Sequence, residues 1–121
     1  MIRNIGDIDL SNVNNEEIIQ FIVFWQKKCE EFKLMNLSNN EYKKQFGEFR
    51  LKKEVILAQN SPTHFHREQI EPPLDMLQTN VELALLVAFD NYRREERVRL
   101  KESYGFLSEL IFLLGKMLGK Y

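Results

Sequence analysis

The sequence contains one cysteine, Cys29, and therefore cannot form a disulfide within a single chain. It also lacks the charged segment followed by an apolar run with which a secretory signal opens, and these two absences together predict a reducing, cytoplasmic compartment. The longest apolar stretch is interrupted by Glu109 and Lys116, so it is too short and too charged to span a bilayer.

The chain has almost no net charge, because its 17 basic residues are balanced by 18 acidic ones. Nonspecific affinity for nucleic acid comes mainly from the neutralisation of phosphates, so a protein that coats nucleic acid over its whole surface is excluded and any basic site must be local. With 121 residues, of which 44% are hydrophobic and 29% charged, the composition predicts one compact domain over residues 1–121.

Sequence motifs for nucleotide binding and hydrolysis are missing: there is no G-x-G-x-x-G, no P-loop and no G-x-S-x-G. His64 and His66 lie near Glu68 and Glu71, but this group falls in a connection bounded by prolines, and structural zinc needs four ligands at recognisable spacing. Cys29 lies on an apolar helical stripe and is predicted to be a small core residue rather than a nucleophile. We therefore expect a protein that is not an enzyme, with no cofactor and no metal site.

Apolar residues recur at helical spacing along most of the chain, and no segment alternates as a strand does. Asn14 and Ser38 each stand three residues before a glutamate, which is the spacing of helix N-caps, so helices are expected to begin there. The prediction is an all-α, four-helix up-down bundle with an irregular N-terminal arm (residues 1–13) and a longer connection between helices two and three. The expected helices cover residues 15–35, 39–58, 73–90 and 95–118.

Two features define the expected helix packing and the helix ends. The first helix has an apolar stripe with Trp25 at its middle, so we expect Trp25 to be buried. Pro72 and Pro73 are expected to begin the third helix, because proline is favoured in the first turn, and Asp90–Asn91 to end it. The alternative is one continuous helix over residues 74–118.

The last predicted helix has two apolar stripes, which predict that it is buried on two sides. A third line along it consists mostly of small residues, although a glycine inside a helix costs about 0.5–1 kcal/mol relative to alanine. Close approach of another backbone would offset that cost, and we therefore predict a homo-oligomer with Phe112, Gly115 and Gly119 at or near the subunit contact. The alternative is that these glycines only end the helix.

Basic residues gather in two places. Four arginines and a lysine lie between residues 93 and 101, and arginine suits RNA because its guanidinium bonds phosphate bidentately and stacks on bases. A second basic set lies on the second helix. The alternative interpretation of both sets is a solvated helix face balanced by neighbouring acids. The candidate nucleic-acid-binding residues are Arg93, Arg94, Arg97, Arg99, Lys101, Lys43, Lys44, Lys52 and Lys53.

The last helix contains Tyr104, Ser108, Leu110, Ile111, Leu114, Gly115, Lys116, Met117, Leu118 and Gly119. This ending resembles the last helix of the four-helix bundle proteins that include the accessory variability determinant (Avd) of diversity-generating retroelements and the proteins encoded in ribosomal RNA intervening sequences. In that family a tyrosine opens the helix and a Gly-Lys/Arg-Met-Leu-Gly/Asn run closes it. The resemblance covers residues 104–119. It implies an up-down bundle that forms a ring-like oligomer and, in the Avd branch, binds a reverse transcriptase and structured RNA.

The sequence thus predicts a non-enzymatic, oligomeric helical-bundle accessory protein that supports a nucleic-acid-processing partner such as a reverse transcriptase. A local basic surface would bind RNA, and no membrane would be involved. The alternative is a protein-interaction module of the immunity, antitoxin or adaptor type with no nucleic-acid role.

Overall fold

The computed structural model describes residues 4–121, except for the side chain of His64. Most of the chain is helical, so the predicted all-α class is confirmed, with a short antiparallel hairpin added in the N-terminal arm. The elements are β1 (Asn4–Ile5), β2 (Ile8–Asp9), α1 (Glu16–Phe32), α2 (Asn39–Gln59), α3 (His64–Tyr104), the 3-10 turn η1 (Gly105–Leu107) and α4 (Ser108–Met117).

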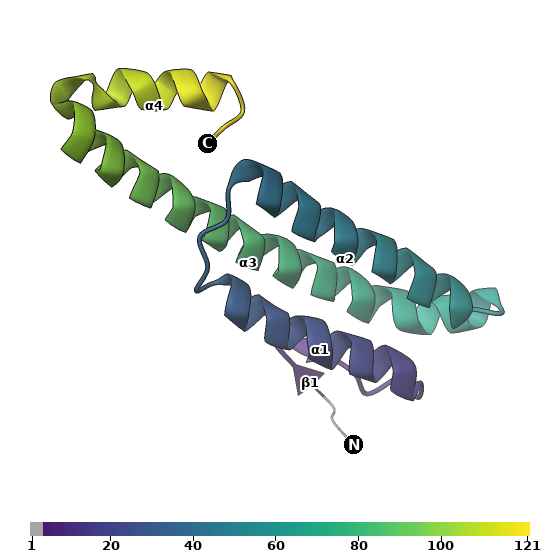
Figure 1. The fold of residues 1–121 in the computed structure, drawn as a ribbon. Coiled ribbons are helices and arrows are strands. Elements are labelled where there is room, and N and C mark those ends of the chain that lie inside the picture. The colour runs from purple at the N-terminus through teal and green to yellow at the C-terminus, as the bar shows by residue number, and fades with distance from the viewer. Residues whose placement is uncertain (1–3) are drawn as a thin grey trace.

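The long helix α3 runs through the whole molecule, and α1 and α2 flank its first part (Figure 1). Beyond the ends of α1 and α2, α3 continues alone, and α4 folds back along this extension. The four-helix up-down bundle predicted from the sequence is therefore wrong. Three helices form the core, and α4 packs on the far part of α3 as one limb of a helical hairpin.

The helix starts follow local capping chemistry. Ser38 caps α2 as predicted, since its hydroxyl accepts a hydrogen bond from the backbone N–H of Glu41 at 3.3 Å. Helix α1 is capped by Asn15 rather than Asn14: the Asn15 side chain accepts from the N–H of Ile18 at 3.2 Å. The Asn15 amide also donates to the side chain of Asn60 at 2.7 Å, and this contact ties the start of α1 to the end of α2.

Helix α3 differs most from the prediction, because it is continuous from His64 to Tyr104 and includes the connection expected before residue 73. Pro72 and Pro73 lie inside it, although a proline there removes one backbone hydrogen bond and normally weakens or bends a helix. Burial of Pro73 and its neighbour Leu74 against the core offsets that loss.

The predicted end of the third helix at Asp90–Asn91 is also wrong. Asn91 stays helical, and its side-chain amide donates to the carbonyl oxygens of Lys33 and Met35, both at 3.1 Å, so it fastens the loop between α1 and α2. Helix α3 instead ends at Gly105, whose φ of 59° is the left-handed conformation that glycine adopts without strain.

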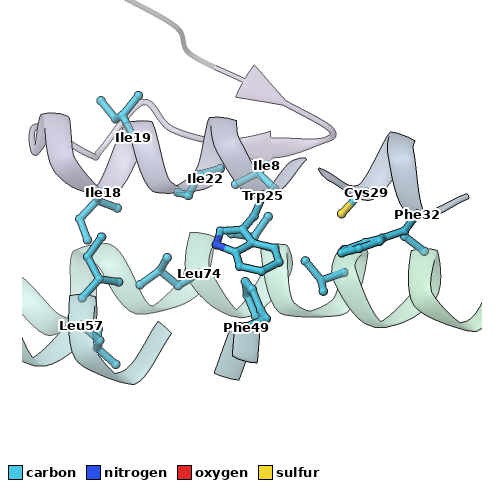
Figure 2. Close-up of a cluster of buried hydrophobic side chains, with 14 of the residues drawn as sticks. Ile8, Ile18, Ile19, Ile22, Trp25, Cys29, Phe32, Phe49, Leu57 and Leu74 are labelled. Atoms are coloured by element: carbon cyan, nitrogen blue, oxygen red, sulfur yellow. The ribbon is translucent and has the colours of Figure 1, made fainter. Parts of the chain in front are cut away.

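The core lies where α1, α2 and the N-terminal arm meet the first part of α3 (Figure 2). Trp25 is 3% exposed, and its ring meets that of Phe49 edge to face at a centroid distance of 5.1 Å. The predicted burial of Trp25 is thus confirmed. Residues 4–13 of the expected arm pack on this core through Ile8 and Leu10, while residues 1–3 lie outside the described part of the chain. Within residues 4–121, no helix has the length and apolar character that a membrane crossing requires.

Candidate functional site

The end of α3 and the residues after it form a separate unit, which we call the C-terminal hairpin (residues 92–121). Its small apolar cluster contains Leu100, Phe112 and Tyr121. The ring of Tyr121 stacks on that of Phe112 with centroids 5.0 Å apart and an interplanar angle of 14°. The Tyr121 hydroxyl donates to Glu96 at 3.3 Å, and burial, followed by the negative charge of Glu96, raises the pKa of Tyr121. The last residue of the chain therefore holds α4 against α3.

The three residues predicted at a subunit contact are used within this one chain. Phe112 is 3% exposed beneath Tyr121. A Cβ atom at Gly115 would lie only 2.3 Å from Cε2 of Tyr121, so the small residue admits an aromatic ring rather than another backbone. Gly119 follows α4 with a φ of 77°, as a helix-ending glycine does. Phe112 and Gly115 are therefore buried within one chain, whereas Gly119 is exposed, and the predicted subunit contact stays a prediction.

Gly115→Ala is expected to displace Tyr121 and loosen α4 from α3. The variant forfeits the aromatic pair, worth about 0.5–1.5 kcal/mol beyond burial, but gains helix propensity of up to about 1 kcal/mol, so global stability should change little. Hydrogen exchange should show faster exchange of the α4 amides with α1 unchanged. Gly47→Ala is the matched control, because nothing lies within 4 Å of its added Cβ. Unchanged α4 protection in Gly115→Ala would contradict the assigned role of Tyr121.

Arg93 and Arg97 contact α4, although Arg97 is also about half exposed to solvent. Their guanidinium carbons lie over the ring of Phe112, at 5.9 Å and 4.7 Å from its centroid. Arg97 also donates to Glu109 at 3.2 Å. These two arginines therefore join the limbs of the hairpin through cation–π contacts and an ion pair.

The other arginines of the predicted cluster bond to side chains of α3 itself. Arg94 donates to the side chain of Asn91 at 2.6 Å, and Arg99 is paired with Glu96. An open depression of about 620 Å³ beside them is lined by residues of both charges: Asn36, Asn91, Arg94, Glu95, Glu96, Val98, Arg99 and Glu102. Arg94 and Arg99 thus share this depression with Glu95, Glu96 and Glu102, so its charge is mixed rather than basic.

Lys53 lies between α2 and α3 and is 7% exposed. Its ammonium group donates to the carboxylate of Asp75 at 2.8 Å and to the side-chain oxygen of Gln78 at 2.9 Å. The assignment of Lys53 to a nucleic-acid-binding surface thus conflicts with its place in the structure, where it serves as a buried polar link between two helices.

The remaining predicted lysines lie at two places on α2. Lys43 and Lys44 are exposed near its start, and the ammonium group of Lys52 lies over the Trp25 ring at 5.8 Å. Because a helix rises about 1.5 Å per residue, Lys43 and Lys52 are about 13 Å apart along the axis. Lys101 is exposed on the C-terminal hairpin. The predicted basic set is therefore divided among separate parts of the molecule.

Two apolar surfaces remain open, and the first is the outer face of α4. Only one side of this helix is buried, which corrects the expectation of burial on two sides. The outer face consists of Leu110, Leu113, Leu114 and Met117, which are 57%, 52%, 51% and 83% exposed. Its sequence signal was the second apolar stripe of the last predicted helix.

The second apolar surface is a groove of about 530 Å³ between α1 and α2, which we call the α1–α2 groove. Its lining comes from these two helices: Glu17, Gln20, Phe21, Phe24, Trp25, Leu51, Lys52, Val55, Ile56 and Gln59. Phe24, Leu51 and Val55 are each about half or more exposed. Sequence reasoning missed this groove, although the first half of α1 is apolar nearly all round and α2 has these apolar residues on its outer side.

Within the described residues, no group of three histidine, cysteine, aspartate or glutamate side chains could hold a metal ion. Cys29 is 1% exposed, as its apolar stripe predicted, and burial raises the pKa of its thiol to about 11. The thiolate is therefore scarce at neutral pH.

Comparisons of the chain with protein-family models, with curated proteins and with solved structures give no significant match. The resemblance of residues 104–119 to the Avd and intervening-sequence family stays a prediction.

Proposed function

We propose that this chain is a non-enzymatic helical interaction module and that its docking element is the outer face of α4. The observation that carries the proposal is the exposure of four large apolar side chains on a ten-residue helix. Apolar area contributes about 25 cal/mol per Å² when it is removed from water, and contiguous exposed patches of this kind mark interaction sites. A partner that covers this face is stabilised mainly by the hydrophobic effect.

The contacts between α3 and α4 support this role, because they hold the docking helix in place before a partner arrives. The cation–π contacts of Arg93 and Arg97, the pair between Arg97 and Glu109, and the stacked Tyr121 all join α4 to α3. A docking element that is already ordered loses less conformational entropy on binding. Two arginines of the cluster, Arg93 and Arg97, thus have a role in holding α4 on α3.

We propose a protein as the partner, in keeping with an adaptor, immunity or antitoxin role in the cytoplasm. A reverse transcriptase, which the resemblance of the last helix implies, belongs to the same class of partner. Structured RNA is less favoured, because the carboxylates of Glu109 and Glu96, which pair with Arg97 and Arg99, would repel a phosphate. The second candidate function is a local RNA contact. It is supported by three exposed lysines, Lys43, Lys44 and Lys101.

Site-specific photocrosslinking in the cell tests the proposal. A benzophenone amino acid at Leu113 on the outer face of α4 is expected to form adducts with protein. The same probe at Thr79, an exposed polar position of α3, should give none. Adducts from neither position, or equal adducts from both, would contradict a docking role for α4.

The RNA alternative predicts a different result in solution. Each phosphate neutralised adds about 0.7–0.9 to the slope of log affinity against log salt. We expect no measurable binding of mixed-sequence structured RNA at low salt by fluorescence anisotropy. Binding with a steep slope that Arg94→Glu and Lys101→Glu together flatten would favour the nucleic-acid role over the protein-docking role.

A further inference from the structure

We infer that α4 of a second copy of this chain occupies the α1–α2 groove. The inference rests on the proposed function and names the partner of the outer face of α4. Helices α1 and α2 each pack more extensively on α3 than on each other, and they flank it (Figure 1). The three helices thus fill three positions of a four-helix arrangement, and the groove between α1 and α2 marks the fourth.

The helix that fills this position cannot be the chain's own α4 in the observed fold. Lys53, next to the groove residue Lys52, pairs with α3 at Asp75 and Gln78. On α4, Glu109 pairs with α3 at Arg97. At about 1.5 Å per residue, Gln78 and Arg97 are about 29 Å apart along α3, so the groove and α4 lie at different levels of the same helix. Only another copy brings the two together.

The dimensions of the two surfaces match. Helix α4 has ten residues and is about 15 Å long. The groove walls run over residues 17–25 of α1 and 51–59 of α2, and each spans about 12 Å. A single convex helix with leucines and a methionine at its outer side suits an apolar trough between two helices.

The charges select one direction for the incoming helix. Glu17 lies at the end of the groove where Asn15 bonds Asn60, and Lys52 lies farther along over Trp25. Helix α4 has Glu109 near its start and Lys116 near its end, about 10 Å apart. An α4 antiparallel to α1 places Lys116 beside Glu17, while Glu109 stays paired with Arg97 of its own chain.

Each copy has both a groove and an α4, so two copies can exchange helices around a two-fold axis. Two equal contacts form, and in both copies the α1–α2 groove and the outer face of α4 are covered. This reciprocity makes the arrangement a closed dimer, and it doubles the area that one helix alone would bury.

Complementation between two variants of the full chain tests the inference, with mass measured by light scattering after size exclusion. The parent is expected to be a dimer. Leu113→Lys on α4 and Leu51→Glu in the groove are each expected to be monomers that keep their helical circular dichroism, since both positions are exposed. An equimolar mixture of the two should form a heterodimer. It contains one unaltered contact, from the intact α4 of one chain and the intact groove of the other, and one contact that joins lysine to glutamate.

Val98→Glu is the matched control, because Val98 is 57% exposed on α3 outside both surfaces, and this variant should stay dimeric. A monomeric parent at high micromolar concentration would overturn the inference, as would a dimeric Leu51→Glu variant or a mixture that stays monomeric. In each of these cases Leu113 adducts with a different protein would leave the proposed docking role of α4 intact.

Discussion

Trp25→Ala is expected to lower the free energy of unfolding by about 3–5 kcal/mol, the loss typical of truncating a large buried aromatic side chain. Trp25 is 3% exposed and its ring lies within 6.5 Å of the rings of Phe21, Phe32 and Phe49, so the variant leaves a cavity where α1 meets α2. A domain of this size has a total stability of about 5–15 kcal/mol. Thermal unfolding followed by circular dichroism should show a Tm lower by about 10–20 °C.

Phe65→Ala is the control for this experiment. Phe65 is also aromatic and helical, but it is 65% exposed at the start of α3, so its removal should shift the Tm by a few degrees at most. A Trp25→Ala variant that melts cooperatively within a few degrees of the parent would show that the three aromatic contacts do not hold the core together.

Lys53→Glu is expected to destabilise the protein by about 3–5 kcal/mol, the range for leaving a buried charge without its partner. In the parent, the Lys53 ammonium group lies 2.8 Å from the Asp75 carboxylate and 2.9 Å from the Gln78 side-chain oxygen. A glutamate there would place a second carboxylate near Asp75 and bury a charge at a position where the parent side chain is only 7% exposed. Urea unfolding should show a lower midpoint with an unchanged slope.

Two further variants at this site separate charge from packing. Lys53→Met keeps the length of the side chain and should stay close to the parent, because a buried ion pair often contributes little more than a well-packed apolar residue. Lys53→Glu combined with Asp75→Lys should recover part of the loss, since it restores opposite charges across α2 and α3. A Lys53→Glu variant as stable as the parent would mean that the contacts of Lys53 with Asp75 and Gln78 contribute little to the free energy of unfolding.

The sequence alone determined the features that depend on neighbours along the chain. Ser38 caps α2 because its hydroxyl needs only the N–H of Glu41, three residues away. The stripe that buries Trp25 and Cys29 follows from helical periodicity within α1. The all-α class followed in the same way, since both caps and periodicity are local.

The tertiary structure decided everything that depends on a partner far along the chain. Helix α3 continues through Pro73 because burial of Pro73 and Leu74 stabilises the helix there. The local sequence pattern does not indicate this burial. Lys53 is buried rather than exposed because it forms an ion pair with Asp75 of another helix, α3. Gly115 is small because Tyr121, which lies beyond the end of α4, folds back over it. The turn of the chain at Gly105 determined which apolar stripe of α4 is exposed to solvent. That turn packs one side of α4 on α3 and leaves the other side in water.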